Sequence, residues 1–396
     1  MIVGGGPVGL MVALALKKGG LRPRIVDKRG GERGAPKAAV LWPRAQLLLE
    51  ELGAFAPFAA RGVPIRRTQV WSGARRLGAL RFGMDGRPPL AIEQHDTERL
   101  LREALAAHSV EVERAEASTL SQTDEAVAVT LAKPDGDAET VRARWLVGCD
   151  GAHSFVRHSL GVPFPGGPRR NLQLWQLDAQ PNWDRGVQPD GGHIVLGRDV
   201  SVSLYPMPGG THRIFAFAHD PDAHDERPNT VEHMRDLVAK AAGAPELRLE
   251  PTEPLWLNRA RFQDRTAARF RHGRVLLCGD AAHVWAPVGG HGMNVGLYGA
   301  ENLARRLLAV IRDGADARAL DLYGRQQRRL ARRVRWATRA DMLEQPPGPL
   351  RLALLEAVMP PLLSWPAFNR AVDAVLGDLR LGRATTGRPS LSRAAA

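Results

Sequence analysis

A glycine-rich turn near the first residue restricts the folds available to this chain more than any other feature. Gly4, Gly6 and Gly9 fit the pattern Gly-x-Gly-x-x-Gly, between an apolar stub at residues 1–3 and a helical pattern over residues 10–18. In such a strand–turn–helix unit the glycines allow a tight turn, close approach of a pyrophosphate and close packing of the helix on the strand. The free amides and the positive end of the helix then bind phosphate.

The residues after this turn support a dinucleotide site. Residues 21–26 predict a second strand that ends at Asp27, and an acidic residue at that place accepts hydrogen bonds from an adenosine ribose. The pattern does not separate NAD from FAD. The stub at residues 1–3 is shorter than the ~5–6 residues typical of a strand. We therefore infer either that this strand is truncated or that the natural start of the protein lies upstream.

Acidic residues also follow two later predicted strands. Residues 145–149 predict a buried strand that leads to Asp150 and Gly151, and another buried strand leads to Asp280. A second glycine-rich helix start follows at residues 289–296. Asp280 is placed to bind a polyol hydroxyl, while the amides of that helix start face an anionic group.

Taken in this order, the motifs resemble those of the FAD-dependent aromatic hydroxylases related to para-hydroxybenzoate hydroxylase, over residues 1–340. The resemblance implies FAD as cofactor, and it assigns no side chain as the catalyst or as a metal ligand. It places the backbone carbonyl of Pro287 near the substrate. The cofactor-binding residues that it implies are Gly4, Gly6, Pro7, Val8, Gly9, Asp27, Lys28, Arg29, Arg44, Gln94, Asp150, Gly151, Asp280, Pro287, Gly289, Gly290, Gly292, Met293 and Asn294.

The chemistry of that family is carried by the flavin. NADPH or NADH reduces FAD, O2 adds to give a flavin C4a-hydroperoxide, and one oxygen atom passes to an electron-rich ring. The resemblance therefore implies a monooxygenase that hydroxylates a phenolic or polycyclic aromatic compound. A quinone-precursor hydroxylase at a membrane and a drug-modifying oxygenase stay open as alternatives.

The chain departs from the family pattern at three positions near the second glycine-rich segment. Gly299 stands where the family usually has an acid, His291 where it usually has glutamine, and Trp285 where histidine is frequent. We interpret His291, together with His153 and His283, as structural histidines rather than ligands. Cys149 and Cys278 are interpreted as small buried apolar residues.

The predicted fold class is α/β, with a Rossmann-like FAD-binding domain, an inserted and mainly antiparallel β-sheet domain, and C-terminal helices. The FAD-binding domain is discontinuous, at residues 1–67, 83–162 and 258–340. The sheet domain, at residues 68–82 and 163–257, would cover the substrate. Residues 341–396 would form the C-terminal helices and a tail.

Short strands alternate with turns in the predicted sheet domain, at residues 171–179, 193–196, 201–205 and 212–218, with a hairpin at residues 68–82. Aromatic residues on these strands either line a substrate pocket or form ordinary sheet core. The candidates are Trp175, Tyr205, Phe215 and Phe217.

Helical patterns are predicted at residues 97–107, 300–311, 323–339, 350–358 and 367–376, with a frayed tail at residues 382–396. Seven arginines mark the third of these patterns, for which we favour a solvated face over a polyanion-binding or membrane-binding face.

The net charge of +13 suggests an acidic partner, although the small share of lysine among the basic residues fits biased composition as well. A basic nucleic-acid-binding protein with a flavin fold stays the alternative from a different class, but no nucleic-acid-binding module is recognisable. Two cysteines are too few for a disulfide framework or a zinc site. No apolar run reaches the ~18 residues that a bilayer span needs. We therefore expect a cytoplasmic monomer or homodimer that binds neither nucleic acid nor membrane.

Overall fold

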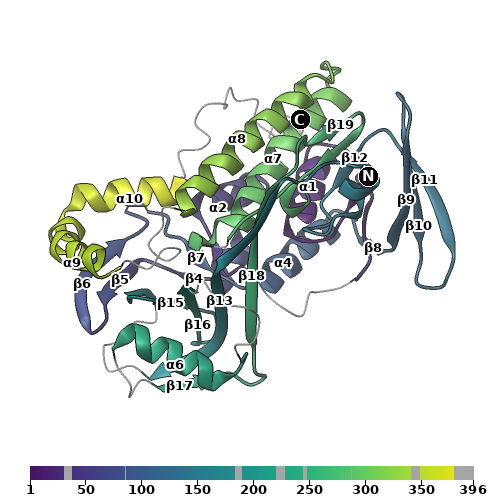
Figure 1. Ribbon diagram of the computed structural model, residues 1–396. Helices are drawn as coiled ribbons and strands as arrows, with labels where there is room; N and C mark the ends of the chain where they lie inside the picture. The colour runs from purple at the N-terminus through teal and green to yellow at the C-terminus, as the bar shows by residue number, and fades with distance from the viewer. Residues whose placement is uncertain are drawn as a thin grey trace.

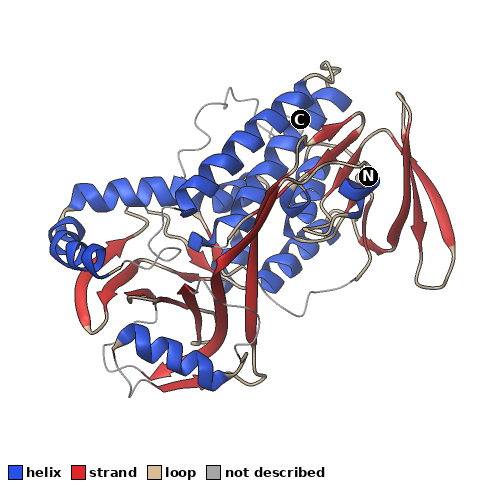
Figure 2. Cartoon of the chain, in the orientation of Figure 1, coloured by secondary structure: helices blue, strands red, loops and turns tan. Residues whose placement is uncertain are grey.

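The computed structural model describes residues 1–30, 38–84, 86–182, 190–219, 228–243, 248–286, 288–339 and 348–378 (Figure 1). One part is a parallel sheet with helices packed around it, and the other is a large sheet with one helix on its outer face (Figure 2). A pair of C-terminal helices lies at the far end of the large sheet. The predicted mixed α/β class is confirmed.

The glycine-rich turn leaves the centre of the parallel sheet, whose strand order is β19-β20-β12-β1-β2-β8. β1 pairs in parallel with both β12 and β2, so Ile2 lies opposite Val147 on one side and Ile25 on the other. The strands are short, and only β19 runs antiparallel to its neighbour. Their bounds are β1 (Ile2–Val3), β2 (Ile25–Asp27), β8 (Val112–Arg114), β12 (Leu146–Gly148), β19 (Arg271–His272) and β20 (Val275–Leu277).

The first helix, α1 (Pro7–Lys18), forms where the sequence predicts it and packs against α4 and α7. Proline suits its first turn, because the missing amide hydrogen would have no helical partner there. Residues 9–16 are buried on every side, as expected of a helix enclosed between layers. The other helices of this part are α2 (Pro43–Glu51), α3 (Ala56–Arg61), α4 (Gln94–Ala106), α5 (Phe155–Ser159), α7 (His291–Ile311) and α8 (Ala319–Arg339).

Two small sheets complete this part. A three-stranded antiparallel sheet, which the sequence analysis does not predict, buries Val127, Val129 and Leu131 against the main core. Its strands are β9 (Glu116–Gln122), β10 (Val127–Ala132) and β11 (Ala138–Ala143). The other small sheet joins β3 (Val40–Leu41), β7 (Leu90–Ala91) and β4 (Val63–Pro64).

The large sheet has the order β21-β18-β13-β16-β15-β14-β5-β6, with β17 paired to β13. All its pairs are antiparallel except β14 with β5. Its strands are β5 (Arg67–Ser72), β6 (Arg75–Arg81), β13 (Gly166–Asn182), β14 (Gly191–Leu196), β15 (Val200–Pro206), β16 (His212–His219), β17 (Arg248–Pro251), β18 (Leu257–Thr266) and β21 (His283–Val284). The predicted strands and hairpin are therefore present. The predicted boundary at residue 257 falls at the start of β18, which pairs within this sheet through residue 266.

A helix that the sequence analysis does not predict, α6 (Val231–Ala242), covers one face of the large sheet. Its buried side chains Met234 and Val238 pack against the sheet core. At the opposite end, α9 (Pro349–Ser364) and α10 (Pro366–Asp378) lie against β6 (Figure 1). None of the helices in the described ranges is both long and apolar enough to cross a membrane. The predicted tail lies outside the described residues.

Candidate functional site

The glycine-rich turn is packed so closely that side chains would not fit at two of its positions. Gly4 has a φ of 110°, and a Cβ there would overlap the carbonyl of Cys149. A Cβ on Gly9 would overlap the carbonyl of Gly4. Gly6 precedes α1 and offers no side-chain cap, and Gly6, Pro7 and Val8 line a cavity. The unsatisfied amides at the start of α1 are therefore available to an anion.

Asp27 holds this turn in place. Its two carboxylate oxygens accept hydrogen bonds from the amides of Gly5, at 2.7 Å, and Arg29, at 2.9 Å. Asp27 does not line the cavity. Of the neighbouring predicted residues, Lys28 is exposed and forms an ion pair with Glu116 at 3.3 Å, and Arg29 is also outside the lining.

Asp150 anchors the start of α5, whose N-cap is Ser154, and the residue after Asp150 lines the cavity. The Asp150 carboxylate accepts hydrogen bonds from the Ser154 hydroxyl at 2.6 Å and from the Val156 amide at 3.0 Å. Burial raises the pKa of Asp150, and these hydrogen bonds oppose the rise. Gly151, with a φ of 84°, lines the cavity. Arg157 donates to the carbonyls of Ala152 and Ala281, which joins this segment to the one that carries Asp280.

The second glycine-rich segment lies directly beside α1. A Cβ added to Gly279 would stand 3.0 Å from Val8 Cγ2, and one added to Gly296 would stand 2.5 Å from it. The absence of a side chain at both positions lets α7 and the turn after β20 approach the start of α1. The short helix η1 (Gly279–Ala281) leaves Asp280 exposed at the cavity surface.

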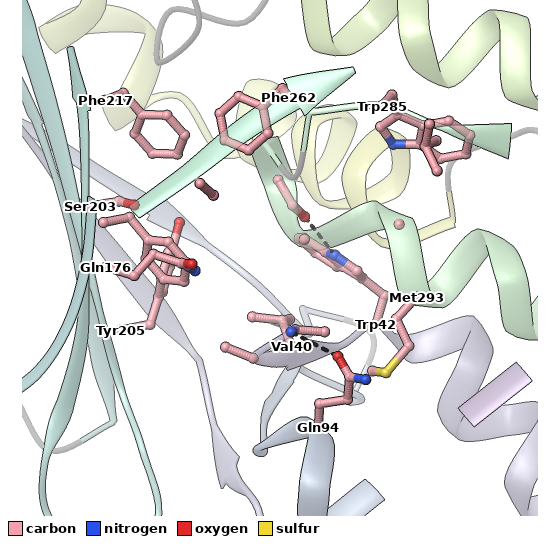
Figure 3. Close-up of a pocket in the computed structure, with 18 of the residues that line it drawn as sticks. Val40, Trp42, Gln94, Gln176, Ser203, Tyr205, Phe217, Phe262, Trp285 and Met293 are labelled. Carbon is pink, nitrogen blue, oxygen red and sulfur yellow. Dashed lines mark hydrogen bonds between the residues drawn. The ribbon is translucent and has the colours of Figure 1, made fainter. Parts of the chain in front are cut away.

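Asn294 fixes the start of α7 to the strand β3. Its Nδ2 donates to the carbonyls of Val40, at 2.9 Å, and Gly290, at 2.8 Å, and its Oδ1 accepts from the Trp42 amide at 2.9 Å. Trp42 Nε1 donates to the carbonyl of Gly289 at 2.9 Å (Figure 3). The predicted residues Gly289, Gly290, Gly292 and Met293 line the cavity, whereas Asn294 is buried behind it. Pro287 lies outside the described residues.

Of the two remaining predicted cofactor residues, Gln94 lines the cavity and Arg44 does not. Gln94 lines the cavity, accepts from the Ala38 amide at 3.3 Å and donates to Glu98 at 2.8 Å. The Arg44 guanidinium stacks over Tyr298, 5.1 Å from the ring centre, and its buried Nε has no hydrogen-bond partner among the described residues. Arg44 does not line the cavity.

The departures from the family pattern have local structural explanations. A Cβ on Gly299 would stand 3.0 Å from Gln327 Nε2, so the space of the usual acid is taken by a side chain of α8. His291 stacks on Trp42 with ring centres 5.3 Å apart, and His283 stacks on Trp285 at 4.7 Å. Burial lowers the pKa of both histidines to about 4, so they are neutral at pH 7. The described residues contain no group of metal-binding side chains.

A single cavity of about 910 Å³ connects these segments with the large sheet. Figure 3 shows Trp42 and Met293 on one side, and Gln176, Ser203 and Tyr205 extending from the strands on the other. The predicted substrate candidates that line it are Tyr205, Phe215 and Phe217.

The expectation for Trp175 is corrected by the structure. Trp175 is fully buried on the other face of the sheet, where its ring contacts His233 of α6. Successive side chains of a strand alternate between the two faces, so the neighbouring Gln176 lines the cavity instead and pairs across the sheet with Phe215.

Some cavity residues are not identified from the sequence. Gln176 accepts a hydrogen bond from Asn258 at 2.9 Å, and both line the cavity. Trp42 is another lining residue, and Arg102 donates to the carbonyl of Gly5 at 3.1 Å behind it. Gln176 could have been identified from one signal, its pairing with Phe215, because cross-strand partners point to the same face of a sheet. That signal requires the register of the two strands.

Known proteins share the sequence and the fold. Residues 1–338 match a family model described as an FAD binding domain. The chain is 33% identical over 378 residues to 6-methylpretetramide 4-monooxygenase of Streptomyces rimosus, covering 91% of this chain and 66% of that protein. It is 32% identical over 370 residues to rifampicin monooxygenase of Streptomyces venezuelae, covering 90% and 74%. It also resembles the solved structure of p-nitrophenol 4-monooxygenase from Pseudomonas putida DLL-E4, with 25% identity, a TM-score of 0.82 and 96% coverage of both chains.

The chain thus spans slightly less than two thirds of the length of the first of these relatives, and nearly all of the p-nitrophenol 4-monooxygenase structure. The residues present fit a dinucleotide cofactor, because the start of α1 has no side-chain cap and opens onto the cavity, and Gly4 and Gly9 allow the tight turn that places it there. The resemblance drawn from the motifs is confirmed. Since the match extends over residues 1–338 of 396, this chain belongs to the FAD-binding domain family, and FAD is its cofactor.

Proposed function

We propose that this protein is an FAD-dependent, NAD(P)H-consuming monooxygenase that hydroxylates a phenolic or polycyclic aromatic compound. The observation that carries the proposal is the single cavity of about 910 Å³, which joins the glycine-rich cradle to an aromatic sheet face. The activities named for the similar proteins, on 6-methylpretetramide, on rifampicin and on p-nitrophenol, support the reaction class.

The proposed cofactor site uses the residues that line one side of the cavity. The amides that open α1, beside Gly6 and Val8, would hold the pyrophosphate. Gln94 and Asp280 would bind polar groups between the two ends of FAD, and Gly289–Met293 would lie beside its ring. Asp27, Asp150 and Asn294 would act indirectly, because each one fixes a backbone segment of this site.

FAD, when bound, supplies the electron transfer from NAD(P)H to O2 and the delivery of one oxygen atom. The chain itself would position the two reactants and exclude water. The apolar sheet face, with Phe215 and Phe217, would hold the aromatic ring, and Gln176 and Tyr205 would orient a hydroxyl group. The amides and positive dipole at the start of α7 would favour negative charge at the adjoining side of the cavity.

Binding of FAD and binding of the substrate are assigned to different segments of the chain. The segments at residues 1–67, 83–162 and 258–340 would bind FAD, and those at residues 68–82 and 163–257 would bind the substrate, although β18 and β21 of the first group pair within the large sheet. Such an enzyme would work in the cytoplasm with O2 and NAD(P)H, as a monomer or homodimer. A drug-modifying oxygenase is the second candidate, and the similarity to rifampicin monooxygenase favours it.

The test is a measurement of bound flavin and of stimulated reductant oxidation. The purified protein, reconstituted with FAD, is expected to retain the cofactor through gel filtration. A panel of phenols, fused-ring aromatics and rifamycin-type drugs should contain compounds that accelerate NADH or NADPH oxidation and gain one oxygen atom in mass. Retained FAD without an oxygenated product from any member would contradict the proposed activity, and failure to retain FAD would contradict the site.

A further inference from the structure

The cavity has a second end that lies away from the glycine-rich cradle. It is bounded there by the inner sides of α9 and α10, which lie against the β5–β6 hairpin (Figure 1). The described side chains at this end are hydrocarbon or thioether groups without a strong hydrogen-bonding atom. They include Val70, Ile194, Met359, Leu363, Phe368 and Val372.

One row of residues across neighbouring strands connects the two ends. Asn258 pairs with Gln176, Gln176 with Phe215, and Phe215 with Ser203. The row continues because Ser203 pairs with Ile194 and Ile194 with Val70. All of these residues line the cavity, and from the polar end to the apolar end they are Asn258, Gln176, Phe215, Ser203, Ile194 and Val70.

The spacing of the strands gives the length of this row. Five steps separate the strand of Asn258 from the strand of Val70, and with about 4.8 Å per step the row is roughly 24 Å long. A single phenol ring occupies only a fraction of that length. The cavity therefore has room for a substrate that extends well beyond one ring.

The polar side of the row offers partners for a hydroxyl group. Gln176 and Asn258 are hydrogen-bonded to each other at 2.9 Å. Ser203, in the middle of the row, adds a hydroxyl to the lining. A ligand hydroxyl beside Gln176 and Asn258 would find hydrogen-bond partners, whereas a polar group at the apolar end would lose its hydration without compensation.

The helix pair that closes the apolar end is firmly attached. The Ser72 hydroxyl donates to Glu356 at 2.6 Å, and the Arg81 amide donates to Asn369 at 2.9 Å. A Cβ on Gly78, which pairs with Val70, would stand only 2.7 Å from Leu363 Cβ. The absence of a side chain at Gly78 thus allows α9 to pack directly on β6, so α9 and α10 form a fixed wall.

We propose that α9 and α10 are the specificity element of this enzyme, and that they bind an uncharged apolar extension of the substrate. This proposal rests on the function proposed above. The substrate would be an amphiphilic phenol, whose hydroxyl end lies near Gln176 and Asn258 and whose alkyl chain or further rings reach under Met359 and Leu363.

Equilibrium dialysis of the FAD-loaded protein, without reductant, tests the length and charge of the ligand. The probes are phenol, para-ethylphenol, para-butylphenol, para-octylphenol and a para-alkylphenol of the same length that ends in a carboxylate. We expect the Kd to fall roughly fourfold for each added methylene group that is buried. The carboxylate-terminated probe should bind at least about tenfold more weakly than para-octylphenol, because its charge would be desolvated without a partner. Equal Kd values across the series, or equal binding of the charged probe, would overturn the proposal.

A matched pair of variants on α10 separates the cavity from general surface binding. Val372 lines the cavity, whereas Val375 is 54% exposed on the same helix. Val372→Phe should weaken para-octylphenol binding about tenfold, since the added ring occupies volume that the octyl group needs. The same variant should leave phenol binding unchanged. Val375→Phe should change neither, and circular dichroism checks that both variants are folded. Equal weakening in the two variants would contradict the role of the helix wall.

The proposed function and this inference fail in different ways. Phenol-stimulated NAD(P)H oxidation with an oxygenated product, but no dependence of Kd on chain length, refutes the extended substrate alone. Tight binding of para-octylphenol without any oxygenated product refutes the proposed activity and leaves the apolar site standing.

Discussion

The side-chain oxygen of Asn294 accepts a 2.9 Å hydrogen bond from the backbone amide of Trp42, across 252 positions of sequence. The Trp42 indole in turn donates to Gly289, so the start of α7 and the end of β3 hold each other in place. This contact shapes the side of the cavity assigned to the flavin ring. We therefore propose that Asn294 positions the backbone of this side and does not contact the cofactor directly.

Replacement of Asn294 by alanine should weaken FAD binding through the backbone that it holds. The change removes three hydrogen bonds, to Trp42, Val40 and Gly290, and leaves buried groups unsatisfied. We expect the Kd for FAD to rise about tenfold or more, and the Tm to fall, because each such bond is worth about 1 kcal/mol. FAD fluorescence on titration measures the Kd, and thermal unfolding measures the Tm.

Asn302→Ala is the matched control on the same helix. Asn302 bonds to Gln326 and Arg306 and does not line the cavity. Its removal should lower the Tm and leave the Kd for FAD unchanged. Similar Kd values for the two variants would show that Asn294 has no special relation to the flavin side of the cavity.

Gly9→Ala should disrupt the cradle more than an ordinary helix substitution does. A Cβ at this position would overlap the carbonyl of Gly4, and neither backbone segment can move freely. Glycine-to-alanine changes inside helices usually stabilise by about 1 kcal/mol, as we expect for Gly324→Ala in α8, where a Cβ meets ordinary contacts. Loss of FAD binding in Gly9→Ala with retention in Gly324→Ala is the predicted result of FAD titration, and full binding in both would contradict the close packing.

The two faces of the large sheet should respond differently to substitution. Phe215→Leu changes the cavity wall and should raise the KM for an aromatic substrate several-fold without changing FAD affinity. Trp175→Phe, on the face covered by α6, should lower the Tm by loss of packing, at a cost of roughly 1–3 kcal/mol, and leave KM unchanged. Steady-state kinetics on the two folded variants measures KM. A KM change for Trp175→Phe alone would contradict the assignment of Phe215 to the cavity face and Trp175 to the opposite face.

Acidification should destabilise the protein through His291. Burial lowers its pKa to about 4, while the unfolded chain titrates near 6.5. The unfolded state therefore binds more protons between pH 6.5 and pH 4, and stability falls as the pH falls through this window. The loss attributable to His291 is at most roughly 3 kcal/mol.

His291→Gln should remove this part of the pH dependence. The Tm of the unmodified protein should drop more between pH 7.5 and pH 5 than that of the variant, as measured by thermal unfolding in matched buffers. Parallel Tm curves for the two proteins would show that His291 is not the buried, neutral side chain described above.

The sequence was sufficient to predict the secondary structure of segments in which only one residue type fits a given position. The glycines of the first turn predicted a strand, a turn and a helix, and the close packing of Gly4 and Gly9 shows why other residues would not fit. The helix after the second glycine-rich segment begins at His291, nine positions earlier than predicted. Gly289 and Gly290, with φ of 72° and 67°, turn the chain directly into that helix.

The parts that escaped prediction depend on partners far away in sequence. The face on which Trp175 lies is decided by the register of β13 against β16, which periodicity alone does not fix. The helical pattern predicted at residues 350–358 stops too early, because α9 runs to Ser364 and its Leu363 packs on Gly78. Each of these outcomes depends on tertiary contacts rather than on local preference.

The incorporation of isotope-labelled O2 tests the central claim most directly. FAD-loaded protein, NADPH or NADH and an aromatic substrate that stimulates reductant oxidation are incubated under labelled O2, and the product is analysed by mass spectrometry. The account predicts a hydroxylated product that carries one labelled oxygen atom, with the second atom released as water. A product labelled from solvent instead, or reductant oxidation that yields only hydrogen peroxide with every substrate tested, would contradict it.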